Sequence, residues 1–194
     1  MKKTNNKGFS LVELIIVIAI MAILAGAIAP ALIRYIDKSR KSNDVTAAKS
    51  IKTAVETALG NESIYEYLTT AGKDAIIVIE PGQPTSTAQA TSYTSDAAVK
   101  IVVAGTCQGI SNTDMGKKAA AEIGTNIGEK TPKIKYKKAS KNGCGTTTVT
   151  PKEFVVIVTQ KGAVEVYLAA DGTDDSFTAS KGLLLSPEVC DSYQ

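Results

Sequence analysis

Residues 7–14 read Lys-Gly-Phe-Ser-Leu-Val-Glu-Leu, and the apolar stretch that follows carries no charged side chain as far as Ile33. Counted from Leu14, this stretch is about twenty residues long. As a helix it would rise roughly 30 Å, the thickness of the hydrocarbon core of a bilayer. Three lysines precede it, and Glu13 is the carboxylate at its start. A membrane anchor explains the apolar stretch, but it does not predict a glycine, an aromatic residue and a glutamate directly ahead of it.

Residues 7–13 resemble the processing site of type IV prepilins, the class III signal, and the likeness extends to about residue 35. In that family a membrane peptidase cuts after the glycine and methylates the new N-terminal phenylalanine. The resemblance therefore implies cleavage after Gly8 and N-methylation of Phe9. It also implies a role for Glu13 in filament assembly and a helix kink at Pro30, because the family has a glutamate and often a proline at these places.

The position of Glu13 has a physical explanation of its own. Cleavage after Gly8 would leave a free amine at Phe9, where the positive end of a helix dipole disfavours it. A carboxylate in hydrocarbon costs about 3 kcal/mol on insertion scales, so Glu13 needs a partner, and the Phe9 amine of a neighbouring subunit is one. The alternative is local: Ser10 and Glu13 have the spacing of a capping box, in which Glu13 only closes the first helical turn.

An ordinary secretory signal is the main alternative for the N-terminus. The apolar stretch is long for a signal core and Glu13 interrupts its start, but residues 25–27 and 27–29 are small-residue triplets that keep conventional cleavage open. Basic residues flank the stretch on both sides, so charge does not orient it. The resemblance places the leader in the cytoplasm, the precursor as a single-pass protein in the cytoplasmic membrane, and the assembled subunit at the cell surface.

The composition argues against an enzyme. The 194 residues include no histidine, so the commonest general base and metal ligand is missing. There is also no Gly-rich phosphate loop, nucleophile elbow or zinc-type pair of cysteines. We expect no catalytic activity, no cofactor and no metal site. Without the three leader lysines the 22 basic residues become 19, equal to the 19 acidic ones, so overall charge does not favour nucleic acid.

Four segments are expected along the chain. They are a leader peptide over 1–8, an apolar transmembrane and filament-core helix over 9–33, the amphipathic half of the same long helix over 34–60, and a globular head over 61–194. Pro30 cannot donate to the carbonyl of Gly26, so a bend or local unwinding is expected at these two residues.

The amphipathic half carries an apolar stripe at spacings of three and four residues, which needs a partner surface. The stripe consists of Val45, Ala48, Ile51, Val55, Ala58 and Leu59. A left-handed stop at Gly60-Asn61 is expected to end the helix.

The rest of the chain predicts an antiparallel sheet with short helices. Strands are expected over 75–80, 99–104, 154–159, 164–168 and 183–185, a helical turn over 63–68, and a helix over 113–123 that Gly124 ends. Residues 154–159 are apolar on both faces, which predicts a central strand that forms a hairpin with 164–168. The hairpin should pack on Ile51 and Val55. The expected fold is α+β, a long N-terminal helix on an antiparallel β-sheet, which is also the pilin fold that the resemblance implies.

One basic patch stands out downstream. Lys133, Lys135 and Lys137 alternate with Ile134 and Tyr136, which predicts a strand with its lysines on one face. Such a face can meet DNA, an anionic surface or an acidic patch on the next subunit. The plainer interpretation is a solvated edge strand that its lysines keep from aggregating.

Three cysteines allow at most one internal disulfide. The resemblance favours Cys144 with Cys190, since many pilins close a C-terminal loop in this way, and the alternative is three free thiols that include Cys107. Residues 171–175 form an acidic turn without EF-hand spacing. Calcium binding there, as in some secretion pseudopilins, is an alternative to a solvated turn.

The sequence therefore predicts a structural subunit of a type IV pilus that acts in adhesion, motility or aggregation. Its partners would be its own copies, a prepilin peptidase, a pilus assembly ATPase, a platform protein and, before assembly, the membrane. Nucleic acid is a less favoured partner of Lys133, Lys135 and Lys137. Two alternatives stay open: the major pseudopilin of a type II secretion or DNA-uptake system, and a membrane-anchored binding module that does not polymerise.

Overall fold

The computed structural model describes residues 9–69, 74–85, 98–102, 114–141, 148–170 and 177–193. The chain divides into two compact units, Met1–Ser39 and Arg40–Gln194, and the second is called the head below. Helix α1, Leu11–Leu59, contributes to both units. The predicted long helix is confirmed, and it continues without a break through Gly26, Pro30 and the polar residues 39–44.

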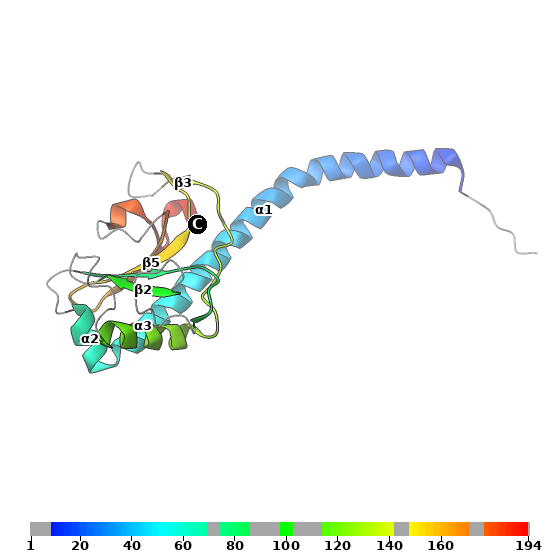
Figure 1. Ribbon diagram of the computed structural model, residues 1–194. Coiled ribbons are helices and arrows are strands. Elements are labelled where there is room, and N and C mark those ends of the chain that lie inside the picture. The colour runs from blue at the N-terminus through cyan, green and yellow to red at the C-terminus, as the bar shows by residue number, and fades with distance from the viewer. Residues whose placement is uncertain are drawn as a thin grey trace, which may run out of the picture. The chain divides into compact units, whose positions relative to one another are not determined.

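The head contains one five-stranded sheet with the strand order β2-β1-β5-β6-β7 (Figure 1). Its strands are β1 Ala75–Ile79, β2 Val99–Val102, β5 Glu153–Val158, β6 Val164–Ala169 and β7 Leu183–Ser186. Every neighbouring pair is antiparallel, and β5 lies in the centre, as its apolar character on both faces predicts. The remaining elements are α2 Glu62–Thr69, α3 Asp114–Ile127, the short pair β3 Ser140–Lys141 and β4 Thr148–Val149, and the 3₁₀ turns η3 Ala179–Lys181 and η4 Asp191–Tyr193.

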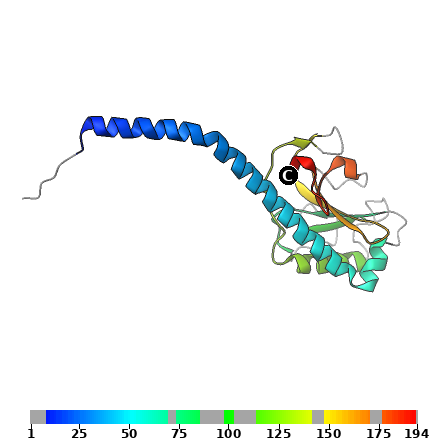
Figure 2. The same ribbon diagram turned by 180° about the vertical axis from the view of Figure 1, so that it is seen from behind.

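The helices of the head lie on one face of the sheet (Figure 2). One buried apolar cluster joins them to that face. Ile51 and Val55 of α1 belong to it together with Phe154 and Val156 of β5 and Val166 of β6, so the predicted packing of the hairpin on the helical stripe is confirmed. Each such side chain contributes roughly 1.5–3 kcal/mol when it is fully buried. The α+β architecture that the sequence predicts therefore rests on this contact between α1 and the sheet.

The opposite face of the sheet carries a second, smaller apolar cluster. It consists of Ile76, Val78, Val155, Ile157, Tyr167, Ala169 and Phe177. The ring of Phe177 meets the ring of Tyr167 edge-on, with 5.9 Å between centroids. The central strands are therefore buried on both faces, as their unbroken apolar sequences require.

Helix α1 ends where predicted, directly before Gly60, but not by the predicted left-handed stop, and the predicted end of the helix at 113–123 is wrong. Gly60 is not left-handed; instead its N–H and that of Asn61 donate to the carbonyls three residues back, Thr57 and Ala58, which tightens the last turn of α1. Helix α3 continues through Gly124 to Ile127, and Gly128, with φ +110°, is the left-handed residue that follows it. Gly124 is therefore a buried residue inside α3 and not the residue that ends it.

The predicted strand at Lys133–Lys137 is also wrong. These residues belong to no strand, although their burial alternates as predicted: the three lysines are exposed, Ile134 is buried and Tyr136 is half-buried. The backbone N–H groups of Lys135 and Tyr136 donate to the side chain of Asp44 on α1 rather than to a neighbouring strand. A carboxylate has thus taken the place of a sheet partner.

Candidate functional site

The N-terminal site begins in non-helical backbone. Gly8 lies outside the described residues, and Phe9 is 91% exposed, ahead of the first helical residue, Leu11. The backbone N–H of Ser10 donates to Oε2 of Glu13 at 2.8 Å, and the carbonyl of Ser10 accepts from Leu14. Glu13 therefore closes the first turn of α1, which is the local role considered above. Its role between subunits stays a prediction.

The first unit presents apolar side chains on all sides of α1. None of its described residues is buried. The exposed set comprises Leu11, Val12, Leu14, Ile15, Ile16, Val17, Ile18, Ile20, Met21, Ile23, Leu24, Ile28, Leu32 and Ile33. This part of α1 is long and apolar enough to cross a membrane, a property that it shares with signal sequences. An apolar surface of this extent needs a lipid or protein partner.

Gly26 and Pro30 lie in this unit and are helical. A Cβ placed on Gly26 would meet no atom within 4 Å, so the glycine is not needed for packing within the subunit. Pro30 leaves the carbonyl four residues back without its helical donor. The kink at these residues stays a prediction for the assembled state.

Asp44 forms a second site, which the sequence analysis missed. Its side chain is 0% exposed. Oδ1 accepts from the N–H of Lys135 at 2.7 Å, and Oδ2 accepts from the N–H of Tyr136 at 2.9 Å and from the hydroxyl of Tyr193 at 3.3 Å. The carboxylate thus joins α1 to the segment 131–137 and to the C-terminal turn η4. A signal for it was present: Asp44 precedes Ala48, Ile51 and Val55 in the phase of the apolar stripe, where a charge must find buried partners.

Lys41, one helical turn before Asp44, strengthens the same contact. Its Nζ donates to the carbonyl of Ser192 at 2.6 Å. The ammonium group also lies 5.2 Å from the ring centroid of Tyr136 and 5.8 Å from that of Tyr193, within cation–π range. The two rings meet edge-on with 5.7 Å between centroids. These five residues form what we call the C-terminal clasp: Lys41, Asp44, Tyr136, Ser192 and Tyr193.

Burial governs the protonation of the clasp. Loss of hydration raises the pKa of the Asp44 carboxyl above its usual value, and the hydrogen bonds from Lys135, Tyr136 and Tyr193 offset part of this rise. Burial, with the nearby Asp44 carboxylate as the second cause, also raises the pKa of the Tyr193 hydroxyl well above its usual range. Tyr193 therefore remains a hydrogen-bond donor at any physiological pH.

Asp44→Ala is expected to lower the free energy of unfolding of the head by about 2–4 kcal/mol, because the backbone N–H groups of Lys135 and Tyr136 lose their acceptor in a buried place. The Tyr193 hydroxyl keeps the carbonyl of Tyr136 as an acceptor. Asp44→Asn should cost less, since one amide oxygen still accepts, but its NH₂ group would face a donor. The measurement is urea unfolding of the full chain in detergent, monitored by tyrosine fluorescence. The chain has no tryptophan that would mask this signal. Equal stability of the alanine variant and the wild type would contradict the structural role of the clasp.

The pH dependence of this contribution has a definite sign. Because the pKa of Asp44 is higher in the folded state, folding binds protons in the interval above pH 3.8, and the contribution of this group falls as the pH rises through the folded pKa. The stability of the wild type minus that of Asp44→Asn should therefore increase as the pH is lowered from 7 to 4. A difference that shrinks on acidification would contradict the raised pKa.

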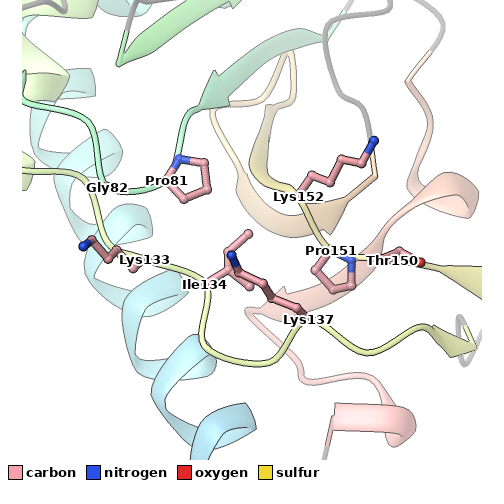
Figure 3. A pocket seen from close by; sticks show the side chains of 8 residues that line it. All are labelled: Pro81, Gly82, Lys133, Ile134, Lys137, Thr150, Pro151 and Lys152. Carbon is pink, nitrogen blue, oxygen red and sulfur yellow. The ribbon is translucent and has the colours of Figure 1, made fainter.

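A groove of about 570 Å³ lies beside the clasp, on the outside of segment 131–137 (Figure 3). We call it the lysine groove. It is lined by Pro81, Gly82, Lys133, Ile134, Lys137, Thr150, Pro151 and Lys152. The structure thus brings together two of the three lysines singled out from the sequence with Lys152, which the sequence analysis missed because it lies far along the chain. Lys135 is exposed but does not line the groove.

Two further predictions fall wholly or partly outside the described residues. The acidic turn at 171–175 is not described, and neither are Cys107 and Cys144. Cys190 carries a free, half-buried thiol whose Sγ lies 3.5 Å from Oγ of Ser192, so its pairing with Cys144 stays a prediction. Within the described ranges no three potential metal ligands lie together.

Comparison with known proteins adds independent observations. A family model described as the prokaryotic N-terminal methylation motif matches residues 3–29. The type IV major fimbrial protein FimA of Dichelobacter nodosus is 32% identical over 123 residues, which are 62% of this chain and 78% of that protein. Fimbrial protein Q of Moraxella bovis is 51% identical over 54 residues, 28% of this chain and 34% of that protein. No solved structure matches the chain.

The length of the alignment with FimA is more informative than its sequence identity. An alignment of 123 residues cannot be contained in α1, which has 49, so the likeness includes part of the head. The methylation motif by itself covers only the leader and the first half of α1. Taken with the α+β fold, the long match shows that this chain belongs to the type IV pilins, the family of the type IV fimbrial proteins.

Proposed function

We propose that the chain is a structural subunit of a type IV pilus, polymerised through the apolar half of α1. The observation that carries the proposal is that every residue of that half is exposed in the isolated subunit, with Glu13 as the carboxylate at its start. In the precursor this surface faces lipid, and in the filament it faces the same surface of other subunits. Both surroundings are dry, so the transfer changes hydrophobic energy little, and close packing must supply the specificity.

Processing comes before assembly in this proposal. A prepilin peptidase cuts after Gly8 and methylates Phe9, a pilus assembly ATPase and a platform protein extract the subunit, and Glu13 pairs with the Phe9 amine of a neighbour. The exposed, non-helical backbone at Phe9 supports it, because a peptidase needs an extended, accessible chain at the bond that it cuts. The precursor is a single-pass membrane protein, and the filament is outside the cell.

Mass spectrometry of the protein recovered from cells tests the processing steps. The expected product begins at Phe9 and carries one additional methyl group. A chain that begins at Met1, or after Ala27 or Ala29, would contradict the proposal and favour an anchored or secreted domain. Electron microscopy of sheared surface material, labelled with an antibody to the head, then tests polymerisation. Labelled filaments are expected, and their absence from processed protein would leave a binding module that does not polymerise.

A further inference from the structure

The lysine groove lies at one end of the head. Thr150, Pro151 and Lys152 directly precede β5, and Pro81 and Gly82 follow β1. Since β1 and β5 are antiparallel, with Ile79 opposite Phe154, the end of β1 and the start of β5 lie side by side. The two segments therefore meet at the same end of the strands. The groove is also at the end where α1 enters the head, because segment 131–137 bonds to Asp44.

Helix α2 lies at the other end. It begins at Glu62, separated by two residues from the end of α1, and a Cβ on Gly162, in the turn between β5 and β6, would lie 2.9 Å from the ring of Tyr65. From Lys152 to that turn, β5 extends for roughly 20 Å. From Asp44 to Leu59, α1 rises about 22 Å. Two independent elements therefore place α2 and the groove at opposite ends of the head.

The lysine groove and helix α2 carry opposite charge. The side chains of Lys133, Lys137 and Lys152 are exposed, and none forms an ion pair with any residue that the structure describes. Exposed Glu62 and Glu66 are four residues apart on α2, so they share one helical face, and α2 has no basic residue. Neither glutamate is ion-paired within the described part of the chain. Each end thus has unused charge that suits the other.

The lining of the lysine groove combines apolar and charged side chains, so it can pack against a partner as well as attract its charge. Pro81, Pro151 and the buried Ile134 give it an apolar part, and the lysines come from two chain segments (Figure 3). The stem of Lys133 lies against Gly82, where a Cβ would be 3.1 Å from its carbons and where φ is +76°. Lysines bind carboxylates as point charges and do not demand the planar geometry that arginine does. A short helix presenting two glutamates beside the half-exposed Tyr65 fits this lining.

We propose that the lysine groove binds the α2 face formed by Glu62 and Glu66 of a second copy of this chain. Because the two surfaces are different and lie at opposite ends, the contact is heterologous and can repeat from copy to copy in one direction without closing. Subunits whose α1 helices share one polarity present the groove end of one head to the α2 end of another. The inference rests on the proposed function and adds a contact between heads to the contact between apolar helices. Charge complementarity of this kind sets register and excludes wrong partners.

A charge exchange in the full chain, expressed in cells, tests the contact. Lys137→Glu with Lys152→Glu, and separately Glu62→Lys with Glu66→Lys, should each lower the yield of sheared filaments at least about tenfold, because like charges then face each other. Lys133 is kept because its stem packs on Gly82. The chain with all four substitutions should regain most of the wild-type yield. Mass spectrometry should show normal processing of every variant.

Lys117→Glu with Lys118→Glu on α3 is the matched control, since it makes the same change in net charge away from the groove. It should leave the yield unchanged. If the wild type forms filaments and the four substitutions together do not restore them, the proposed contact is wrong while the proposed function stands. If the processed wild type forms no filaments at all, the proposed function itself fails.

A competing partner is the acidic sequence 171–175, which closely follows Ala169 along the chain, and the carbonyl of Ala169 accepts a hydrogen bond from the N–H of Lys152. Restoration of filaments by Asp171→Lys and Asp174→Lys in the Lys137→Glu, Lys152→Glu chain, without any change in α2, would assign the lysines to this turn and overturn the proposal. The expected result is that Glu62→Lys with Glu66→Lys restores filaments to the Lys137→Glu, Lys152→Glu chain and that Asp171→Lys with Asp174→Lys does not.

Discussion

Gly8→Leu should leave the precursor uncut and abolish filaments. The bond that follows Gly8 lies just before α1, where Phe9 and Ser10 are non-helical and Phe9 is exposed, so the chain itself does not obstruct a peptidase. Type IV prepilins, which this site resembles, have a glycine before this bond. A branched side chain at that position would clash with a peptidase site that accepts a residue without a side chain. The measurement is intact mass and gel mobility of the protein in membrane fractions.

The expected product of this variant keeps Met1 and migrates more slowly than the wild type. Lys7→Arg is the matched control, because it changes the neighbouring residue and preserves its charge, and it should be processed normally. A faster-migrating product that begins at Phe9 in the leucine variant would contradict the assignment of the cleavage site. Slow migration with filaments still present would contradict the need for processing before assembly.

The elements that the sequence predicted well are those in which one strong pattern agrees with its surroundings. Residues 75–80 and 154–159 are too apolar to be anything but buried strands, and both became parts of the sheet within one residue of the expected ends. The stripe through Ile51 and Val55 has one period and one natural partner, so its packing could be predicted. The N-terminal methylation motif depends on local sequence alone, so it could be recognised without a structure, while the roles of its residues stay predictions.

The errors concern residues whose local preference was outweighed by a distant partner. Residues 133–137 alternate like a strand, but the carboxylate of Asp44 lies 91 positions before Lys135 and takes its N–H group. Gly124 resembles a helix stop, yet α3 continues through it to Ile127, and the glycine is buried. The clasp was missed for the same reason: Tyr193 lies 149 positions from the aspartate that it bonds, and no local pattern connects the two.

The lysine groove could be predicted only in part from the sequence pattern. The sequence marked Lys133 and Lys137 as a basic patch, which is a statement about charge. It could not supply Lys152 or the apolar part formed by Pro81 and Pro151, because these come from chain segments that only the pairing of β1 with β5 brings together. Nor could it place Glu62 and Glu66 at the far end of the head, which depends on the lengths of β5 and α1.

Glu13→Ala should still insert into the membrane and be cut at Gly8, but filament yield should fall by at least about a hundredfold, since an unpaired amine in an apolar bundle costs several kcal/mol. The structure allows a local explanation as well, because Glu13 accepts from the N–H of Ser10 at 2.8 Å and closes the first turn of α1. Loss of that bond alone should cost only about 1 kcal/mol, since water can reach the exposed helix end. The alanine variant does not separate the two roles.

Glu13→Gln separates them. A glutamine at this position of a capping box can still accept from the N–H of Ser10, so the local role is preserved while the charge is lost. If Glu13 pairs with the Phe9 amine of a neighbour, the glutamine variant should be nearly as defective in filament yield as the alanine variant, with processed, methylated subunit accumulating in the membrane. If Glu13 only closes the first turn, the glutamine variant should form filaments at the wild-type level. Glu13→Asp, which keeps the charge on a shorter side chain, should lie between the two variants and the wild type, because the ion pair then depends on reach.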